Sequence, residues 1–435
     1  MANTTNTGTS RRTNGPSADP LEDTGATIRG VSTVRGTVTL LPDPPARELW
    51  CPIISVDDHF LEPPETFVDR VPRADRQRVP HIETDDAGLP RWVIDDERFE
   101  LLVHECSVGR PISEWTLAPA KFEEFRPGTY DVHARVADMD INGVYASLNF
   151  PSSTWGFAGR RLSLMKDERI ALLSLRAYNE WMMEGWCGVY PNRFIPCQLP
   201  WLRDPTLAAA EIRRNSEHGF KAVSFSENPE LMGLPHIYSD HWDPFFEACQ
   251  ETETVINLHV GSSGTVNRPS SVSPFAVTAS LFPMSGIATI VDWIFAKVPL
   301  RFPKLKIALS EAGVSWVPTI IERLNKSYRQ IEGLGVRWAP SDPTPTDLLH
   351  RNFWFTSIED PSAFRVLDII GEERVMLESD YPHPDTSWPD TQAVARTGLS
   401  HLEPATIKKL CYENASQLYR HEPPPDQFIA RSVIG

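Results

Sequence analysis

Several apolar runs in this sequence end at side chains that can bind a divalent cation. Such runs are typical of buried strands, and the residues that follow them are Asp57 with His59, His259, Glu311 and Asp380. Carboxylates and imidazoles are the ligands of zinc, manganese and iron sites. We therefore predict one bound divalent metal ion, with zinc as the first choice and manganese or iron as alternatives.

The first of these sites is an Asp-x-His pair directly after the apolar run 52–56. Residues two apart in a strand face the same side, so Asp57 and His59 can point together while Asp58 points away. Aspartate also opens many turns, so a pair of this kind on its own marks a turn more often than a metal site.

The other sites also have structural alternatives. His259 precedes the loop 261–264 and could simply bond to its backbone, since buried polar groups find partners. Glu311 could pair with Arg323 or Lys326 on the helix expected next in the chain. Taken together, these alternatives require independent coincidences at every strand end, which favours a shared site.

The elements that would position these residues are strands alternating with helices. Strands are expected near residues 52–56, 143–150, 194–199, 221–226, 254–260, 305–309, 353–357 and 374–380. This alternation predicts an α/β fold with a parallel sheet, and eight strands can close a (β/α)8 TIM-type barrel. A doubly wound open sheet is the alternative, but no Gly-rich phosphate loop follows the first strand.

The barrel is expected over residues 50–420, with an insertion at about 61–131 after its first strand. A β-hairpin is predicted within the insertion at 91–103, from two alternating runs around Asp95-Asp96-Glu97. Residues 1–49 form a leader that we expect to be mostly disordered, because its start is rich in Thr, Asn, Ser and Gly. Residues 421–435 form a C-terminal tail.

Composition limits the class of partner. The net charge of −16 argues against a nucleic-acid-binding surface. No stretch reaches the about 18 consecutive apolar residues of a membrane span, and the N-terminus lacks the apolar core of a secretory signal. The six cysteines are scattered without a CxxC motif, as is typical of reduced thiols in a cytoplasmic protein. A small-molecule substrate is the expected partner.

A set of longer motifs resembles a known family. They are Ile54-Ser-Val-Asp-Asp-His-Phe-Leu-Glu-Pro63, Asp138-Met-Asp140, Leu258-His-Val-Gly-Ser262, Phe302-Pro-Lys-Leu-Lys-Ile307, Ser310-Glu-Ala-Gly-Val-Ser-Trp-Val-Pro318, Glu378-Ser-Asp-Tyr-Pro-His-Pro384 and Asn414-Ala415. The chain, from about 51 to 420, resembles the amidohydrolase superfamily in the branch that includes aminocarboxymuconate-semialdehyde decarboxylase.

The resemblance implies a (β/α) barrel with one metal ion at its C-terminal mouth, and it also implies a homodimer. The family's metal ligands fall on Asp57, His59, His259 and Asp380. The first position usually holds histidine or glutamate rather than aspartate. Many members carry a histidine where this chain has Glu311, which weakens direct transfer of the decarboxylase mechanism and leaves Glu311 as either a general base or a further ligand.

The first expected activity is metal-assisted hydrolysis of an amide, ester, lactone or C–C bond next to a carbonyl. Glu311 or Asp380 would take the proton of the attacking water. Four residues are candidates for substrate binding: His383, Tyr381, His236 and Arg268. His383 could instead be a structural turn residue. Two alternatives remain: non-oxidative decarboxylation of an aromatic or unsaturated acid, and a catalytically inactive barrel that serves as a binding protein.

Overall fold

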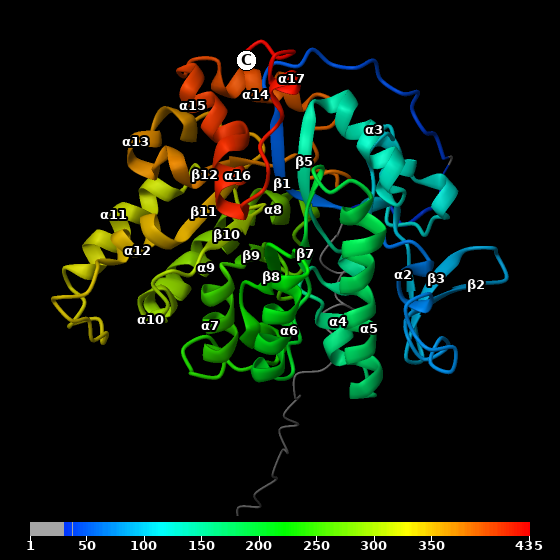
Figure 1. Cartoon of the computed structure of the whole chain (residues 1–435), viewed down its shortest axis with the longest axis horizontal. Coiled ribbons are helices and arrows are strands. Elements are labelled where there is room, and N and C mark those ends of the chain that lie inside the picture. The colour runs from blue at the N-terminus through cyan, green and yellow to red at the C-terminus, as the bar shows by residue number, and fades with distance from the viewer. Residues whose placement is uncertain (1–29, 37) are drawn as a thin grey trace, which may run out of the picture.

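The computed structural model describes residues 30–36 and 38–435. Two sheets of parallel strands lie in the middle of the molecule, and helices surround them (Figure 1). The first sheet has the order β1-β5-β6 and the second β12-β11-β10-β9-β8-β7. Their strands are β1 (Ile53–His59), β5 (Val144–Phe150), β6 (Phe194–Ile195), β7 (Cys197–Gln198), β8 (Ala222–Ser226), β9 (Val255–His259), β10 (Ile307–Ser310), β11 (Phe353–Ser357) and β12 (Val375–Leu377).

The two sheets meet at both of their edges. Only Pro196 separates β6 from β7, and proline has no N–H group to continue a strand ladder. At the other edge, the Asp380 amide donates to the Asp57 carbonyl at 2.9 Å, and the His59 amide donates to the Tyr381 carbonyl at 2.6 Å. The strands therefore follow one another in chain order, and the carboxyl ends of β1, β9, β10 and β12 lie at the same end of the parallel sheets.

Helices connect successive strands, as the alternating pattern predicts. The longer ones are α3 (Val132–Asn142), α5 (Glu168–Trp181), α6 (Pro205–Glu217), α7 (Asp243–Thr252), α9 (Phe282–Phe295), α11 (Val317–Tyr328), α12 (Pro345–Asn352) and α14 (Thr391–Leu399). The shorter ones are α2 (Glu65–Val68), α4 (Arg160–Leu164), α8 (Phe275–Ser280), α10 (Val298–Arg301), α13 (Leu367–Ile370), α15 (Pro404–Lys408), α16 (Asn414–Tyr419) and α17 (Asp426–Ile429). No helix in the described part of the chain is both long enough and apolar enough to span a membrane.

Local signals set the limits of helix α3. The Asp131 carboxylate accepts from the amides of His133 and Ala134 at the helix start, which is the usual N-cap. At the other end Gly143 adopts φ 67°, a left-handed conformation that glycine takes without steric cost. The chain then enters β5 at once, so this helix is held close to the first strand pair.

The insertion after β1 carries a small antiparallel sheet of its own. It consists of β2 (His81–Thr84), β3 (Pro90–Ile94) and β4 (Glu97–Glu100), and β3 and β4 form a hairpin around Asp95 and Asp96. This sheet lies at the edge of the molecule (Figure 1). The sequence pattern indicated two strands here, and the structure adds β2 as a third.

The two ends of the chain pack on the barrel-like core where they are described. The leader was predicted to be mostly disordered over residues 1–49, and residues 1–29 and 37 of it lie outside the described residues. The Ser32 carbonyl accepts from the Leu117 amide at 2.7 Å, so this part of the leader joins the insertion. In the C-terminal tail, the Val433 amide donates to the Leu49 carbonyl at 3.0 Å, next to the start of β1.

Candidate metal centre and cavity

Asp57 and His59 lie on one face of β1 and point into the mouth of the parallel sheets. Both are fully buried, and Asp57 Oδ1 lies 3.3 Å from His59 Nε2. The side chain of Asp58 points to the opposite face, as the two-residue period of a strand requires. There Asp58 accepts from the Ser379 hydroxyl at 2.6 Å and the Ser55 hydroxyl at 2.8 Å.

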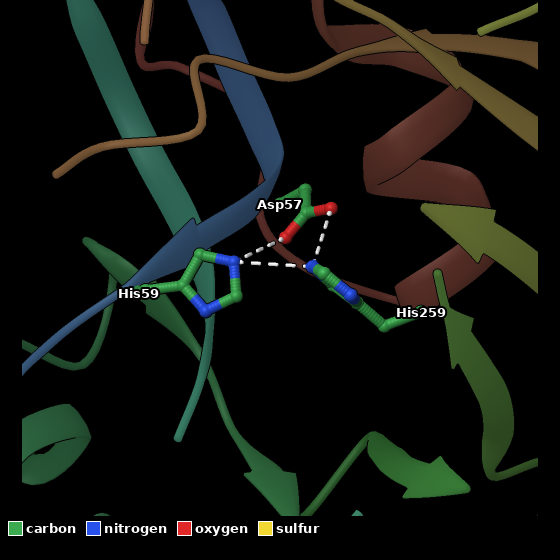
Figure 2. A group of neighbouring side chains, drawn as sticks. All are labelled: Asp57, His59 and His259. Atoms are coloured by element: carbon green, nitrogen blue, oxygen red, sulfur yellow. Dashed lines mark hydrogen bonds and ion pairs between the residues drawn. The ribbon is translucent and has the colours of Figure 1, made fainter. Parts of the chain in front are cut away.

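His259, the last residue of β9, meets this pair from across the sheets. Its Nε2 lies 3.2 Å from His59 Nε2 and 3.5 Å from Asp57 Oδ2, and Figure 2 shows the three side chains pointing toward one another. Nδ1 of His259 lies 2.7 Å from the Val260 carbonyl. As the donor in that contact, Nδ1 carries the proton, which leaves the lone pair on Nε2 facing the other two side chains.

Asp380 and His383 follow β12 and complete the cluster. Asp380 Oδ1 lies 3.4 Å from His59 Nε2 and 3.1 Å from His383 Nδ1. The rings of His59 and His383 stack with centroids 3.7 Å apart. Asp380 has φ 51°, a left-handed conformation that is uncommon outside glycine and concentrates at functional sites.

The carboxylates of this cluster lack the partners that buried oxygens require. Both carboxylate oxygens of Asp57 and both of Asp380 are buried without a hydrogen-bond donor, an arrangement that costs several kcal/mol for a charged group unless a cation is present. Two groups of side chains have ligand atoms close enough to share one ion: Asp57 with His59 and His259, and His59 with Asp380 and His383. These residues therefore fit a divalent cation.

Electrostatics favour the same conclusion. Burial, and after it the charges of Glu378, Asp380 and Glu311, raises the pKa of Asp57 well above its usual value. Burial lowers the pKa of His259 to about 3 and that of His59 well below its usual value. The imidazoles are thus neutral, which is the form that binds metal, and a cation would relieve the crowding of negative charge.

Glu311, at the turn after β10, faces the cluster rather than the following helix. Its Oε2 lies 3.6 Å from His259 Nε2, and its backbone has φ 58°. The alternative pairing with Arg323 or Lys326 is therefore not what the structure shows. Burial, and next the charge of Asp380, raises the pKa of Glu311 well above its usual value, so this carboxyl holds a proton readily.

A cavity of about 1000 Å³ opens onto the cluster, and Glu311, Asp380 and His383 line it. Three of the residues predicted to bind substrate do not line it. Tyr381 is buried, and its hydroxyl donates to Asp138 Oδ2 at 2.6 Å on the far side of the loop. His236 lies exposed next to Tyr238, and Arg268 belongs to a part of the loop after β9 that the cavity does not reach. The structure therefore places these three side chains away from the cavity lining, and their roles in substrate binding stay predictions, because loop order along the chain does not determine where a side chain points.

Residues of two kinds near the site were not predicted from the sequence. Arg135 of α3 donates to the His59 and Gly128 carbonyls, and its NH1 lies 3.8 Å from Asp58 Oδ2. His104 and Glu105 of the insertion line the cavity. The Asp-x-Asp motif 138–140 on the same helix as Arg135 was visible in the sequence, but no local pattern connected that helix with the backbone of β1.

Comparisons with known proteins identify a family for this chain. A model of the family described as amidohydrolase matches residues 134–421. A curated relative, the 2-amino-3-carboxymuconate-6-semialdehyde decarboxylase of Dictyostelium discoideum, is 26% identical over 200 residues, which is 45% of this chain and 52% of that protein. The match thus spans about half the length of the relative.

Solved structures share the fold along nearly their whole length. An amidohydrolase of Mycobacterium avium subsp. paratuberculosis K-10 has a TM-score of 0.65 at 22% identity, covering 85% of this chain and 99% of the other. The 5-carboxyvanillate decarboxylase of Sphingomonas paucimobilis has a TM-score of 0.59 at 20% identity, with the same coverage. A dihydroxybenzoic acid decarboxylase of Polaromonas sp. JS666, solved with manganese and 2-nitroresorcinol, has a TM-score of 0.56 at 18% identity, covering 85% and 97%. The likeness to these amidohydrolases implies a TIM-type barrel, and the family match shows that the chain belongs to the amidohydrolase family.

Proposed function

We propose that this protein is a metal-dependent, non-oxidative decarboxylase of an aromatic or unsaturated carboxylic acid. The observation that carries the proposal is the cluster of orphaned carboxylate oxygens and neutral imidazoles at one end of a cavity. The relatives named as decarboxylases support this choice over hydrolysis, which reverses the order expected from the sequence. The proposal includes a closed eight-stranded barrel in which β6 and β7 act as one strand.

The residues that would hold the cation are Asp57, His59, His259 and Asp380. When bound, a divalent cation supplies Lewis acidity and polarises the substrate oxygens next to it. Zinc, manganese and iron all suit two carboxylates and two imidazoles. The manganese in the dihydroxybenzoic acid decarboxylase makes manganese the first ion to test.

Glu311 is the proposed proton donor. In decarboxylation the bond between the substrate carbon and its carboxylate breaks, carbon dioxide leaves, and the electron pair stays on the carbon, which then accepts a proton. Glu311 lines the cavity, and its Oε2 lies 3.6 Å from Nε2 of the candidate ligand His259, so its carboxyl is close enough to the cluster to deliver this proton. Asp380 is the second candidate for this role.

Hydrolysis is the runner-up, because the same site could activate a water molecule. It would require Glu311 or Asp380 to accept a proton from that water, and the relatives named as decarboxylases favour the other reaction. A catalytically inactive binding protein is the third possibility. Two buried carboxylates without hydrogen-bond donors, which are costly to keep without an ion, argue against it.

The test is an assay of the manganese-loaded protein with hydroxybenzoic acids in ¹⁸O-labelled water. We expect release of carbon dioxide, with no ¹⁸O in the organic product. Glu311→Gln should lower the rate by about 100-fold or more while manganese still binds, and the exposed-site variant Glu332→Gln should match the parent. Cleavage of an ester or lactone of such an acid by the same protein, with ¹⁸O in the released acid, would support hydrolysis instead.

The ligand set is tested separately by His259→Ala and Asp380→Asn. Each variant should lose bound manganese, as measured by elemental analysis after gel filtration. Full manganese content in both variants would show that the ion, if any, binds elsewhere.

A further inference from the structure

The cavity extends beyond the cluster of acids and imidazoles, because residues of the insertion and of the loop after β9 also line it. Its volume of about 1000 Å³ is at the top of the range of roughly 300–1,000 Å³ for pockets that bury drug-sized ligands. The outer part lies between the insertion and the loop after β9, and its walls include Trp115, Phe275 and Phe282. We refer to the space between these three side chains as the outer chamber.

Aromatic rings continue from the inner end to the outer chamber. Phe157, which lines the cavity, has its ring centroid 4.2 Å from that of His259 and 6.1 Å from that of His383. Farther out, Phe275 lies edge-on to His104 at 5.2 Å and to Phe282 at 6.4 Å. Each of these aromatic side chains is half-buried, namely Trp115, Phe157, Phe275 and Phe282. Each therefore still has apolar surface that a ligand can cover.

The charged groups at the rim of the cavity are engaged with protein partners. Arg91 NH2 lies 3.0 Å from Glu100 Oε1, and Arg98 NH2 lies 2.9 Å from Glu83 Oε2. The guanidinium of Arg161 lies over the ring of Phe99 at 3.5 Å. Because these three guanidinium groups already have partners in the protein, the contacts that the outer chamber offers from Trp115, Phe275 and Phe282 are ring surfaces.

The described part of the leader crosses the outer chamber. Ser32 forms a bridge with Thr116 and accepts from the Leu117 amide, on the side of the insertion. At Gly30, an added Cβ atom would lie 3.5 Å from Cβ of Pro274, on the side of the loop after β9. Gly30, Val31 and Ser32 all line the cavity, so this part of the leader forms one wall of the chamber.

We propose that the substrate is an elongated acid of two parts, with its carboxylate at the inner cluster and a second ring or comparable apolar group in the outer chamber. This inference rests on the proposed function for the reaction at the inner end. It adds the size and the polarity of the rest of the substrate. A single-ring acid would leave the outer chamber unfilled. Covering the three aromatic side chains would favour binding through apolar burial.

The test compares salicylic acid with its phenyl-substituted derivative, in which the second ring is para to the hydroxyl group. Both are supplied to the manganese-loaded protein, and both kcat/KM and the dissociation constant are measured. Ala279→Trp places a large ring in the chamber, because Ala279 of α8 lines the cavity and is half-buried. Ser280→Trp is the matched control, since Ser280 is the next residue, is exposed and does not line the cavity.

We expect the phenyl derivative to bind about tenfold or more tightly than salicylic acid. Ala279→Trp should remove most of this advantage while leaving salicylic acid within about twofold, and Ser280→Trp should change neither. Equal binding of the two acids, or an equal loss of both in Ala279→Trp, would overturn the inference. If neither acid releases carbon dioxide, the proposed reaction fails for these acids, and the binding ratio still decides the question of the chamber.

Discussion

Asp57 and Asp58 are neighbours in the chain, and both are fully buried at the end of β1, yet their surroundings differ completely. Neither oxygen of Asp57 has a hydrogen-bond donor. Asp58 accepts from two hydroxyls and from the Tyr381 amide at 3.3 Å, with Arg135 nearby. Asp58 receives hydrogen-bond donors and a nearby guanidinium from the protein itself, which indicates a structural role. Asp57 receives neither, which fits a carboxylate that binds a metal ion.

The contrast extends to the loops behind each residue. On the side of Asp58, Arg126 binds Asp138 through two hydrogen bonds of 2.6 and 2.8 Å and lies over the Trp388 ring at 4.5 Å. This network joins the insertion, α3 and the segment after β12. On the side of Asp57, the neighbours are the other candidate ligands and the cavity. The face of β1 that carries Asp58 thus contacts the network that joins the loops. The face that carries Asp57 points to the candidate metal site.

The largest effect on stability is expected from Asp58→Ala. The substitution leaves Arg135 buried beside the His59 carbonyl without its nearest carboxylate, and breaking a buried ion pair costs about 3–5 kcal/mol. Urea unfolding of the metal-free protein measures the loss. Asp86→Ala, at an exposed position of the β2–β3 turn, should change the free energy of unfolding by less than about 0.5 kcal/mol. Equal free energies of unfolding for Asp58→Ala and Asp86→Ala would contradict a structural role for the Asp58 face of β1.

Asp57→Asn should have two opposite effects. Loss of the charge should weaken manganese binding by about 100-fold or more. Mutating a residue that only hydrogen-bonds to a metal ligand already lowers metal affinity by about 10–100-fold, and Asp57 is a proposed ligand itself. In the metal-free protein the variant should be more stable than the parent at neutral pH, because burial and neighbouring acids raise the pKa of Asp57 and its ionised form is therefore costly in the folded state. Calorimetric titration and urea unfolding measure the two effects, and unchanged manganese affinity would contradict the assignment.

Glu62 provides an intermediate case between the two aspartates. It accepts from the amide and hydroxyl of Ser152 at 3.1 and 2.6 Å but has no cation, and burial raises its pKa to about 7. The folded state therefore keeps the Glu62 proton that the unfolded chain releases near pH 4.5. The contribution of Glu62 to the free energy of unfolding is thus fully present below pH 4.5 and is lost as the pH rises through about 7. The loss is up to about 3 kcal/mol.

Glu62→Gln should remove this pH dependence, since the amide can keep both contacts with Ser152 without ionising. Urea unfolding of variant and parent at about pH 5 and about pH 8 measures it. The free energy of unfolding of the variant, minus that of the parent, should be larger at the higher pH than at the lower pH. A constant difference would mean that Glu62 ionises as easily in the folded protein as in the unfolded chain.

The smallest effect is expected from Tyr381→Phe. The phenol hydroxyl donates to Asp138, but Arg126 still binds both oxygens of that carboxylate in the variant. Loss of one hydrogen bond should cost about 1 kcal/mol, with manganese affinity unchanged. Tyr238→Phe is the exposed counterpart, in which the lost bond to Asp292 should cost less. A large fall in manganese affinity in Tyr381→Phe would show that the two faces of β1 are coupled.

Local sequence predicted the strands well, because buried parallel strands are short apolar runs. The run at 353–357 coincides with β11, and the runs ending near His259 and Phe150 agree with β9 and β5 to within one residue. The strand expected at 194–199 is interrupted by Pro196, which the apolar pattern alone does not reveal. The direction of Tyr381 was not predictable either, because it depends on contacts with the distant side chains Arg135 and Asp138.

By itself, the sequence determined which residues end the strands and on which face of β1 each aspartate lies, because the two-residue period of a strand is a local property. Only the tertiary structure decided that Glu311 faces His259, that Arg135 reaches the backbone of β1 and that the leader crosses the cavity. These features depend on segments far apart in the chain, whose positions are set by packing and by backbone turns such as those at Glu311 and Asp380.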